Sequence, residues 1–316
     1  MKYCLRIAVF ILFLITIFPY HARAEVNKSS CFTGAFLSDN PSSEDIRYFK
    51  HSYGKNPFLV MIFIDWNKPL LAKIVQDVYG ENCVLFITWE PWDALKQTGI
   101  DYNALINGKY DKYITDFALS LKKIDEVVFL RFAHEANGDW YPWSAKKIGK
   151  ESYIQLYRHV KDIFDQHNLN KVKWIFSVNW EDVPKEQNDF MLYYPGDKYV
   201  DYAAIDGYNW GRTKPWSKWM SFREIFVNRY NEITKHTNKP VLISEFSSTA
   251  SGGDKAVWIR EAMQTIKEMP ALRGFIIFNL EKERDWSFPP ESSYGKELKT
   301  QLRDAYFVDK KAGLYD

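Results

Sequence analysis

The chain has 316 residues, of which 46% are hydrophobic and 26% charged, and this composition is ordinary for a globular protein with one large domain. Its 42 basic and 40 acidic residues leave a net charge of +2 without a basic cluster, which argues against a nucleic-acid or anionic-lipid partner. Aromatic residues make up 17% of the chain and include 12 Trp and 20 Tyr, so large rings are available for more than core packing.

The N-terminus has the pattern of a secretory signal peptide. Two basic residues, Lys2 and Arg6, precede an apolar run at 7–18, and an Ala-x-Ala motif at 22–24 precedes Glu25. An uncleaved anchor is the alternative, but about a dozen apolar residues are few for a membrane span. We therefore expect residues 1–24 to be removed and residues 25–316 to form a secreted or periplasmic catalytic domain. Cleavage would leave 39 basic against 40 acidic residues, which suits an uncharged partner.

Eight short apolar runs recur along the chain and alternate with amphipathic stretches. The runs are predicted as strands at 32–37, 58–65, 84–89, 127–132, 172–178, 202–208, 241–246 and 275–280. Near-continuous apolar runs are typical of parallel strands, and the stretches 152–164 and 255–268 have helical periodicity. Eight repeats predict a single (β/α)8 TIM barrel with a last helix at 295–306. The alternative is an open doubly wound sheet, which the lack of an early Gly-x-Gly-x-x-Gly motif disfavours.

Two cysteines, Cys31 and Cys83, remain after the predicted cleavage. They stand at the starts of the first and third runs, and two inter-strand spacings amount to about 9–10 Å. A disulfide needs Cα atoms within about 7 Å, so we expect two free thiols. No Cys or His grouping has the spacing of a metal site, and no metal or cofactor is expected.

Polar and aromatic side chains gather at the carboxyl ends of the predicted strands. In a parallel barrel these ends meet at one face, where active sites form. Glu135 follows the fourth run and Glu245 ends the seventh, so the two would face each other across the mouth. Retaining glycosidases need two carboxyl groups about 5–5.5 Å apart. We therefore predict Glu135 and Glu245 as the catalytic pair of carboxyl groups.

Neighbouring residues at the strand ends are predicted to bind substrate. They are His134, Trp140, Tyr208, Asp206, Trp89, Trp92, Trp180 and Asn137. The Trp rings offer flat apolar faces to sugars, and Tyr208 is expected to donate a hydrogen bond to Glu245. Arg131 is expected to stabilise charge inside the barrel rather than contact substrate. Asn137 and Gly138 are expected to shape the loop, with Gly138 permitting a turn that other residues resist.

The segment 131–143, RFAHEANGDWYPW, resembles the acid/base motif of glycoside hydrolase family 26, in which His precedes the catalytic Glu and Asn-Gly and Trp follow. Residues 241–245 resemble its nucleophile strand, and residues 206–208 resemble the Asp-x-Tyr that supports the nucleophile and the −1 sugar. The resemblance spans nearly the whole mature chain. It implies Glu135 as the acid/base and Glu245 as the nucleophile of a retaining (β/α)8 endo-glycanase. The family acts mostly on β-1,4-mannan and sometimes on mixed-linkage β-glucan or β-1,3-xylan.

The substrate remains open at this stage. Residues 140–144 and 278–286 depart from the best-known mannanases, so endo-β-1,4-mannanase activity is the first expectation and mixed-linkage endo-β-1,3-1,4-glucanase activity the alternative. A processing enzyme for an exopolysaccharide would use the same residues. A non-catalytic carbohydrate-binding barrel is disfavoured because both glutamates are present. A polysaccharide or oligosaccharide partner and a monomeric chain are expected.

Overall fold

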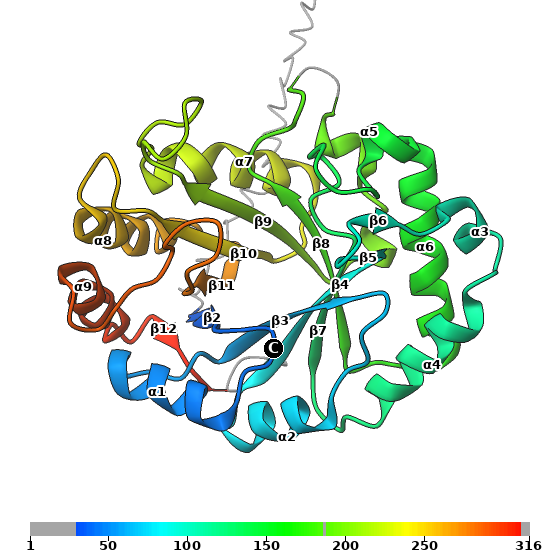
Figure 1. Cartoon of the computed structure of the whole chain (residues 1–316), viewed down its shortest axis with the longest axis horizontal. Helices are drawn as coiled ribbons and strands as arrows, with labels where there is room; N and C mark the ends of the chain where they lie inside the picture. Colours follow the sequence, from blue (N-terminus) through cyan, green and yellow to red (C-terminus); the bar gives the residue numbers. More distant parts are fainter. Residues whose placement is uncertain (1–29, 186–187, 311–316) are drawn as a thin grey trace, which may run out of the picture.

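A computed structural model describes residues 30–185 and 188–310, so the predicted signal peptide lies outside the described residues. Eight parallel strands close into a barrel that helices surround (Figure 1). In barrel order the strands are β2 (Gly34–Phe36), β3 (Leu59–Asp65), β4 (Val84–Glu90), β7 (Val128–Phe132), β8 (Val172–Asn179), β9 (Tyr202–Asn209), β10 (Val241–Ser248) and β11 (Leu272–Phe278). Strand β11 pairs with both β10 and β2, which closes the sheet. The predicted (β/α)8 barrel is confirmed, and the open sheet is excluded.

Helices follow the strands and form the outer wall. The larger ones are α1 (Ser43–Tyr53), α2 (Ala72–Gly80), α4 (Asp111–Lys122), α6 (Lys150–Gln166), α7 (Phe222–His236), α8 (Lys255–Ile266) and α9 (Ser293–Leu302). Short strands and helices lie in the loops and near the ends of the described chain: β1 (Cys31–Phe32), β5 (Trp92–Asp93), β6 (Thr98–Gly99), α3 (Tyr102–Ile106), α5 (Ala145–Ile148), η1 (Phe190–Tyr193), η2 (Asp197–Tyr199) and β12 (Phe307–Val308). Helices α1 and α7 each begin with a capping box, at Ser42 and Ser221, which satisfies backbone donors at their first turns.

Side chains of the barrel strands alternate between an inner and an outer apolar layer. In β4, Val84 and Phe86 belong to the inner cluster, and Leu85, Ile87 and Trp89 belong to the cluster between the strands and the helices. All five are buried. Both layers are close-packed, so the polar strand ends are held on a rigid frame.

Cys31 and Cys83 are both free and buried, which confirms the predicted thiols. Cys31 lies in β1, and Cys83 lies just before β4, with β11, β2 and β3 between these two strands in the sheet. Burial raises the pKa of the Cys83 thiol to about 12, so it stays protonated and unreactive.

Candidate active site

The predicted nucleophile, Glu245, lies in β10 at a β-bulge. Pairing with β9 skips Ser244, which is an extra residue between Ile243 and Glu245. Regular alternation would turn Ser244 and Glu245 to opposite faces. Because of the bulge both point inward, where Ser244 Oγ donates to Asp206 Oδ1 over 2.6 Å. Glu245 Oε2 accepts from the hydroxyl of Tyr208 over 2.5 Å, as the sequence predicts.

Arg131 of β7 joins two carboxylates beneath the mouth of the barrel. Its Nη1 donates to Asp206 Oδ1 over 2.8 Å, and its Nη2 donates to Glu245 Oε1. The remaining guanidinium donors reach Thr88 Oγ1 at 3.0 and 2.8 Å. Because Arg131 is 0% exposed, it cannot contact substrate, and its predicted role in stabilising charge inside the barrel is confirmed. It holds the Glu245 carboxylate in one orientation.

Arg131→Met is expected to destabilise the fold by about 3–5 kcal/mol, because it leaves two buried carboxylates without their cation. Arg131→Lys keeps the charge but cannot bridge both carboxylates with a planar fork, so an intermediate loss is expected. Chemical denaturation of the purified variants measures both effects.

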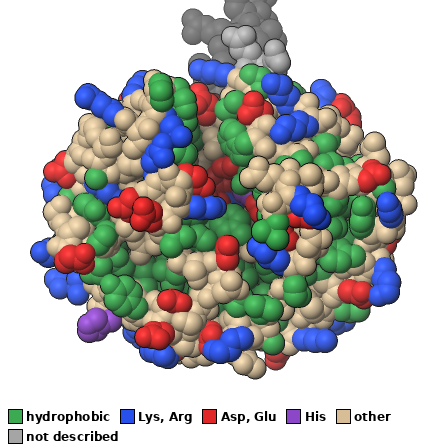
Figure 2. Space-filling model, in the orientation of Figure 1, with side chains coloured by type: hydrophobic (Ala, Val, Ile, Leu, Met, Phe, Trp, Pro, Cys, Tyr) green, Lys and Arg blue, Asp and Glu red, His purple; other side chains and the backbone are tan. Residues whose placement is uncertain are grey.

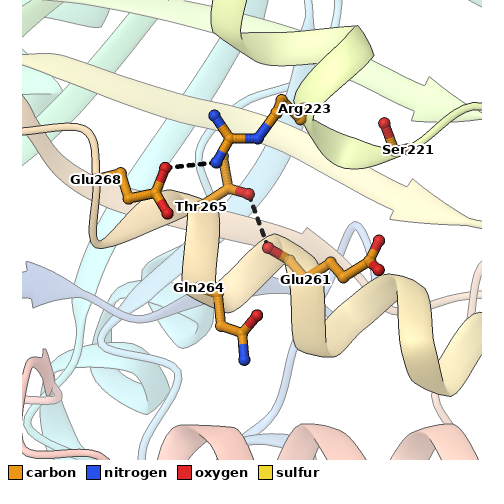
Figure 3. Close-up of a pocket in the computed structure, with 6 residues that line it drawn as sticks. All are labelled: Ser221, Arg223, Glu261, Gln264, Thr265 and Glu268. Carbon is orange, nitrogen blue, oxygen red and sulfur yellow. Dashed lines mark hydrogen bonds and ion pairs between the residues drawn. The ribbon is translucent and has the colours of Figure 1, made fainter.

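The matched control is Arg223→Met on the outside of the barrel. Figure 3 shows Arg223 of α7 bonded to Glu268 in a shallow polar depression beside α8. These side chains are 55% and 60% exposed, so removing this pair is expected to cost less than about 1 kcal/mol. Equal losses in Arg131→Met and Arg223→Met would contradict the proposed importance of the buried network.

The predicted acid/base, Glu135, lies in a tight turn after β7. Ala133 and Glu135 adopt positive φ angles of 47° and 53°, a conformation that costs a non-glycine residue about 1–3 kcal/mol. The turn is held by Glu135 N, which donates to Ser177 O over 2.9 Å. It directs the carboxyl group to two donors: Asn179 Nδ2 at 2.9 Å and Trp140 Nε1 at 2.8 Å. Backbone strain thus accompanies the positioning of this side chain.

The two glutamates lie in different electrostatic settings. Burial raises the pKa of Glu135 to about 8, and the negative charges of Asp206 and Glu245 act in the same direction. Donation from Asn179 and the charge of Arg131 oppose this shift but are outweighed. Glu135 therefore holds a proton at neutral pH, while Glu245 has a cation and a tyrosine hydroxyl as donors. This is the division that an acid/base and a nucleophile require.

Activity is expected to fall as pH rises through about 8, because Glu135 must be protonated to assist the leaving group and its pKa is raised to about 8. A pH profile of kcat/KM, which reports groups of the free enzyme, measures this limb. Glu135→Ala assayed with an activated aryl glycoside should lose the limb. A basic limb that persists in that variant would assign it to another group.

Trp89 is not a sugar platform, contrary to the prediction. It is 0% exposed and packs outward, with its ring centroid 4.2 Å from that of Phe117 and 4.9 Å from that of Trp66. The reason is the period of two along β4, which places Trp89 on the helix side with Leu85 and Ile87. Asp206 and Asn137, also predicted to bind substrate, are 0% exposed as well.

Asp206 and Asn137 support the site from behind. Asp206 Oδ2 accepts from Ser177 Oγ over 2.6 Å, and its Oδ1 is held by Arg131 and Ser244. Asn137 Nδ2 donates to Asp182 Oδ1, and Asn137 Oδ1 accepts from the backbone N–H of Asn179, both over 2.8 Å. These contacts occupy the polar atoms that the prediction assigned to sugar. Asn137 does shape the loop, as the sequence also suggested.

Four other predicted residues lie around the mouth in different degrees of exposure. Trp140 is 43% exposed, and Trp92 and Trp180 are half-buried. His134 is buried, with Nε2 3.0 Å from the hydroxyl of Tyr141 and no partner for Nδ1 in the described part of the chain. Burial, Arg131 and Lys282 lower its pKa, so it is neutral. Sugar contact by these four side chains and Tyr208 stays a prediction.

Gly138 is required for space rather than for its backbone angle. Its φ is not in the left-handed region, which Ala133 and Glu135 occupy instead. A Cβ at Gly138 would lie 2.4 Å from a ring carbon of Trp140. Because that ring donates to Glu135, any larger residue at 138 would displace this donor of the Glu135 carboxyl group.

Sequence reasoning missed two polar residues at the mouth, Asn179 and Glu90. Asn179 ends β8 and donates to Glu135, but the neighbouring ring of Trp180 was preferred. Glu90 ends β4, is 6% exposed, and accepts from Trp92 Nε1 over 3.0 Å. Burial raises its pKa to about 7. Glu90 could have been found from the alternation of side chains along β4, because it lies two positions after Thr88, which points into the barrel and accepts from Arg131.

The face shown in Figure 2 is hollowed near its centre, and acidic side chains lie in the hollow. An eight-stranded parallel barrel with two glutamates in contrasting settings at its mouth is the architecture of a glycosidase that works through two carboxyl groups. The family model described as "Glycosyl hydrolase family 26" matches residues 32–272, and the chain belongs to this family of retaining endo-glycosidases.

Relatives in this family act on several polysaccharides according to their names. "Endoglucanase H" of Acetivibrio thermocellus is 39% identical over 80% of this chain and 28% of its own length. A "Mannan endo-1,4-beta-mannosidase" of Bacillus subtilis is 26% identical over 62% of this chain and 49% of its own length. A "Beta-1,3-xylanase" of Alcaligenes sp is 21% identical over 70% of this chain and 50% of its own length. The chain therefore spans half or less of each of these relatives.

Solved structures share the fold at lower identity. The GH26 domain of an endo-β-mannanase/endo-β-glucanase from Prevotella bryantii superposes with a TM-score of 0.66 at 15% identity, covering 90% of this chain and 91% of that one. A Bacillus subtilis mannanase superposes with a TM-score of 0.65 at 20% identity, covering 92% and 89%. At these identities the likeness concerns the fold alone.

Proposed function

We propose that this chain is a secreted endo-β-glucanase that cleaves mixed-linkage β-glucan with retention of configuration. The observation that carries the substrate class is the 39% identity to endoglucanase H, against 26% to the Bacillus subtilis mannanase. This difference in identity supports glucan ahead of mannan, which is the first expectation from the sequence. The segment 278–286, which departs from the best-known mannanases, supports the same order.

The mechanism assigned to the site is a double displacement. Glu245 attacks the anomeric carbon while Glu135 gives its proton to the leaving oxygen, which forms a covalent glycosyl-enzyme. Arg131 and Tyr208 orient the attacking carboxylate. The covalent bond removes the negative charge of Glu245, one cause of the raised pKa of Glu135. The pKa of Glu135 then falls, so the same group takes a proton from water in the second step.

A polysaccharide panel with reducing-sugar detection tests the substrate. We expect turnover of barley β-glucan and lichenan to exceed that of mannan, glucomannan and xylan, with oligosaccharides rather than monosaccharide released. Mannan remains the second candidate because mannanases are among the relatives. Faster turnover of mannan would reject the glucanase, and release of monosaccharide alone would reject endo action. Products that lengthen when an acceptor oligosaccharide is added would favour a processing transglycosylase.

Secretion is the part of the proposal that rests on the N-terminal sequence. Residues 1–24 have the basic start, apolar run and Ala-x-Ala motif of a cleavable signal. In the described part of the chain, no helix is long and apolar enough to cross a membrane. N-terminal sequencing of the protein recovered outside the cytoplasm should begin at Glu25. An intact N-terminus in the membrane fraction would favour the uncleaved anchor.

A further inference from the structure

A row of aromatic rings leads from the nucleophile toward the rim of the barrel. Tyr208, which donates to Glu245, lies with its ring centroid 4.8 Å from that of Trp286. Trp286 is 5.0 Å from Trp210, with the ring planes at 90°, and Trp210 is 5.4 Å from Trp216. The row is continuous in space although its members come from the β9 strand end, the following loop and the loop after β11. It therefore connects Trp216 with the catalytic centre.

From Trp286 outward, exposure increases along this row. Trp286 is 1% exposed and Trp210 is half-buried, but Trp216 is 70% exposed. Trp216 and Trp140 are the two tryptophans among the exposed large apolar side chains of the described residues. Trp140 already contacts Glu135. A second exposed indole in direct continuity with the site is what a distal contact for a long substrate requires.

The loop that carries Trp216 (residues 210–221) joins β9 to α7 and is held to the barrel (Figure 1). Asn209 Oδ1 accepts from the backbone N–H of Gly211 over 3.1 Å and from that of Met220 over 3.0 Å, which ties both ends of the loop to one side chain. Thr213 Oγ1 also donates to the carbonyl of Trp210 over 2.7 Å. The loop thus presents the exposed ring in a fixed place rather than on a mobile tail.

We infer that Trp216, with the edge of Trp210 beside it, forms a distal sugar-binding subsite that extends the substrate cleft past β9. Its ligand is a β-linked glucan segment a few units away from the bond that is cleaved. Such sugars present apolar C–H faces, and an indole ring gives a flat apolar surface that is costly to leave in water. This inference rests on the proposed function for the identity of the sugar, but its geometry depends only on the continuous row.

The test compares wild type and Trp216→Ala on substrates of increasing length. With barley β-glucan and long mixed-linkage oligosaccharides, kcat/KM is expected to fall about tenfold, because stacking on one large ring is lost. With a short aryl glucoside that occupies only the subsites next to Glu245, kcat/KM is expected to stay unchanged. Calorimetry in a Glu245→Ala background should show affinity rising with chain length only when Trp216 is present.

Two controls accompany these measurements. Trp216→Phe keeps an aromatic face and should recover part of the long-chain activity. Tyr48→Ala removes a 62% exposed ring from α1 on the outer wall and should leave every substrate unaffected. Equal losses on short and long substrates, or no loss on either, would overturn the distal subsite. If the wild type cleaves mannan instead of glucan, the length series is run with manno-oligosaccharides, so the glucanase proposal can fail separately.

Discussion

Glu245→Ala is expected to lose hydrolysis on every substrate, by about 10⁴-fold or more, because no other group can attack the anomeric carbon from the same place. The loss should not depend on the leaving group, since the covalent step itself is absent. Initial rates on barley β-glucan and on an activated aryl glycoside measure it. Proton NMR of the wild-type reaction should show a first product that keeps the β configuration.

The control for this variant is Glu268→Ala, which removes an acidic side chain that is 60% exposed on the outside of the barrel. It should retain wild-type turnover. Melting curves show whether Glu245→Ala is folded, since Arg131 loses one of its two carboxylate partners in that variant. Turnover near the wild-type rate in folded Glu245→Ala, or an inverted first product, would defeat the nucleophile assignment.

Glu135→Ala is expected to slow hydrolysis of polysaccharide by about 10²–10⁴-fold, because the leaving oxygen no longer receives a proton. With an activated aryl glycoside the first step needs little acid assistance, so the glycosyl-enzyme should form and then accumulate. Azide should attack the anomeric carbon of this intermediate, displace the Glu245 carboxylate and give a β-glycosyl azide. The rate with and without azide, together with the anomer formed, measures the effect.

Glu245→Ala is the control for the azide experiment with Glu135→Ala. Glu245→Ala should form no β-glycosyl azide, because it cannot make the covalent glycosyl-enzyme that azide attacks to give the retained product. Trp140→Phe removes one donor to the Glu135 carboxyl and should change the pH profile without changing the response to azide. Lack of rescue in folded Glu135→Ala, with both short and long substrates, would argue for a different acid/base.

Much of the architecture could be predicted because it depends on local chemistry. Apolar runs of strand length mark the barrel strands, and the predicted run at 84–89 differs from β4 by one residue. The bounds of the last strand are predicted less accurately. The predicted range is 275–280, whereas β11 spans Leu272–Phe278. The start is missed because Gly274 interrupts the apolar pattern after Leu272 and Arg273. Strand ends meet at one face in any parallel barrel, so Glu135 and Glu245 could be placed together before their surroundings were known.

The direction in which a strand-end side chain points was decided by tertiary structure. In the sequence Trp89 and Trp92 are equivalent candidates for sugar contact. The alternation of side chains along β4 turns Trp89 toward the helices, where it is buried. The bulge at Ser244 turns two consecutive residues inward, and the residue types at this position do not predict a bulge.

Sequence by itself determined the family and the fold and predicted the two glutamates as the catalytic pair, because these depend on residue type and order along the chain. The orientation and protonation of the two carboxyl groups were decided only by contacts in the folded barrel. The cation Arg131 comes from β7, Asp206 from β9 and Glu245 from β10, so their pairing is a contact between distant segments. Charge and burial act through space and not along the chain, and the raised pKa of Glu135 could therefore be assigned only once burial and the neighbouring carboxylates were located.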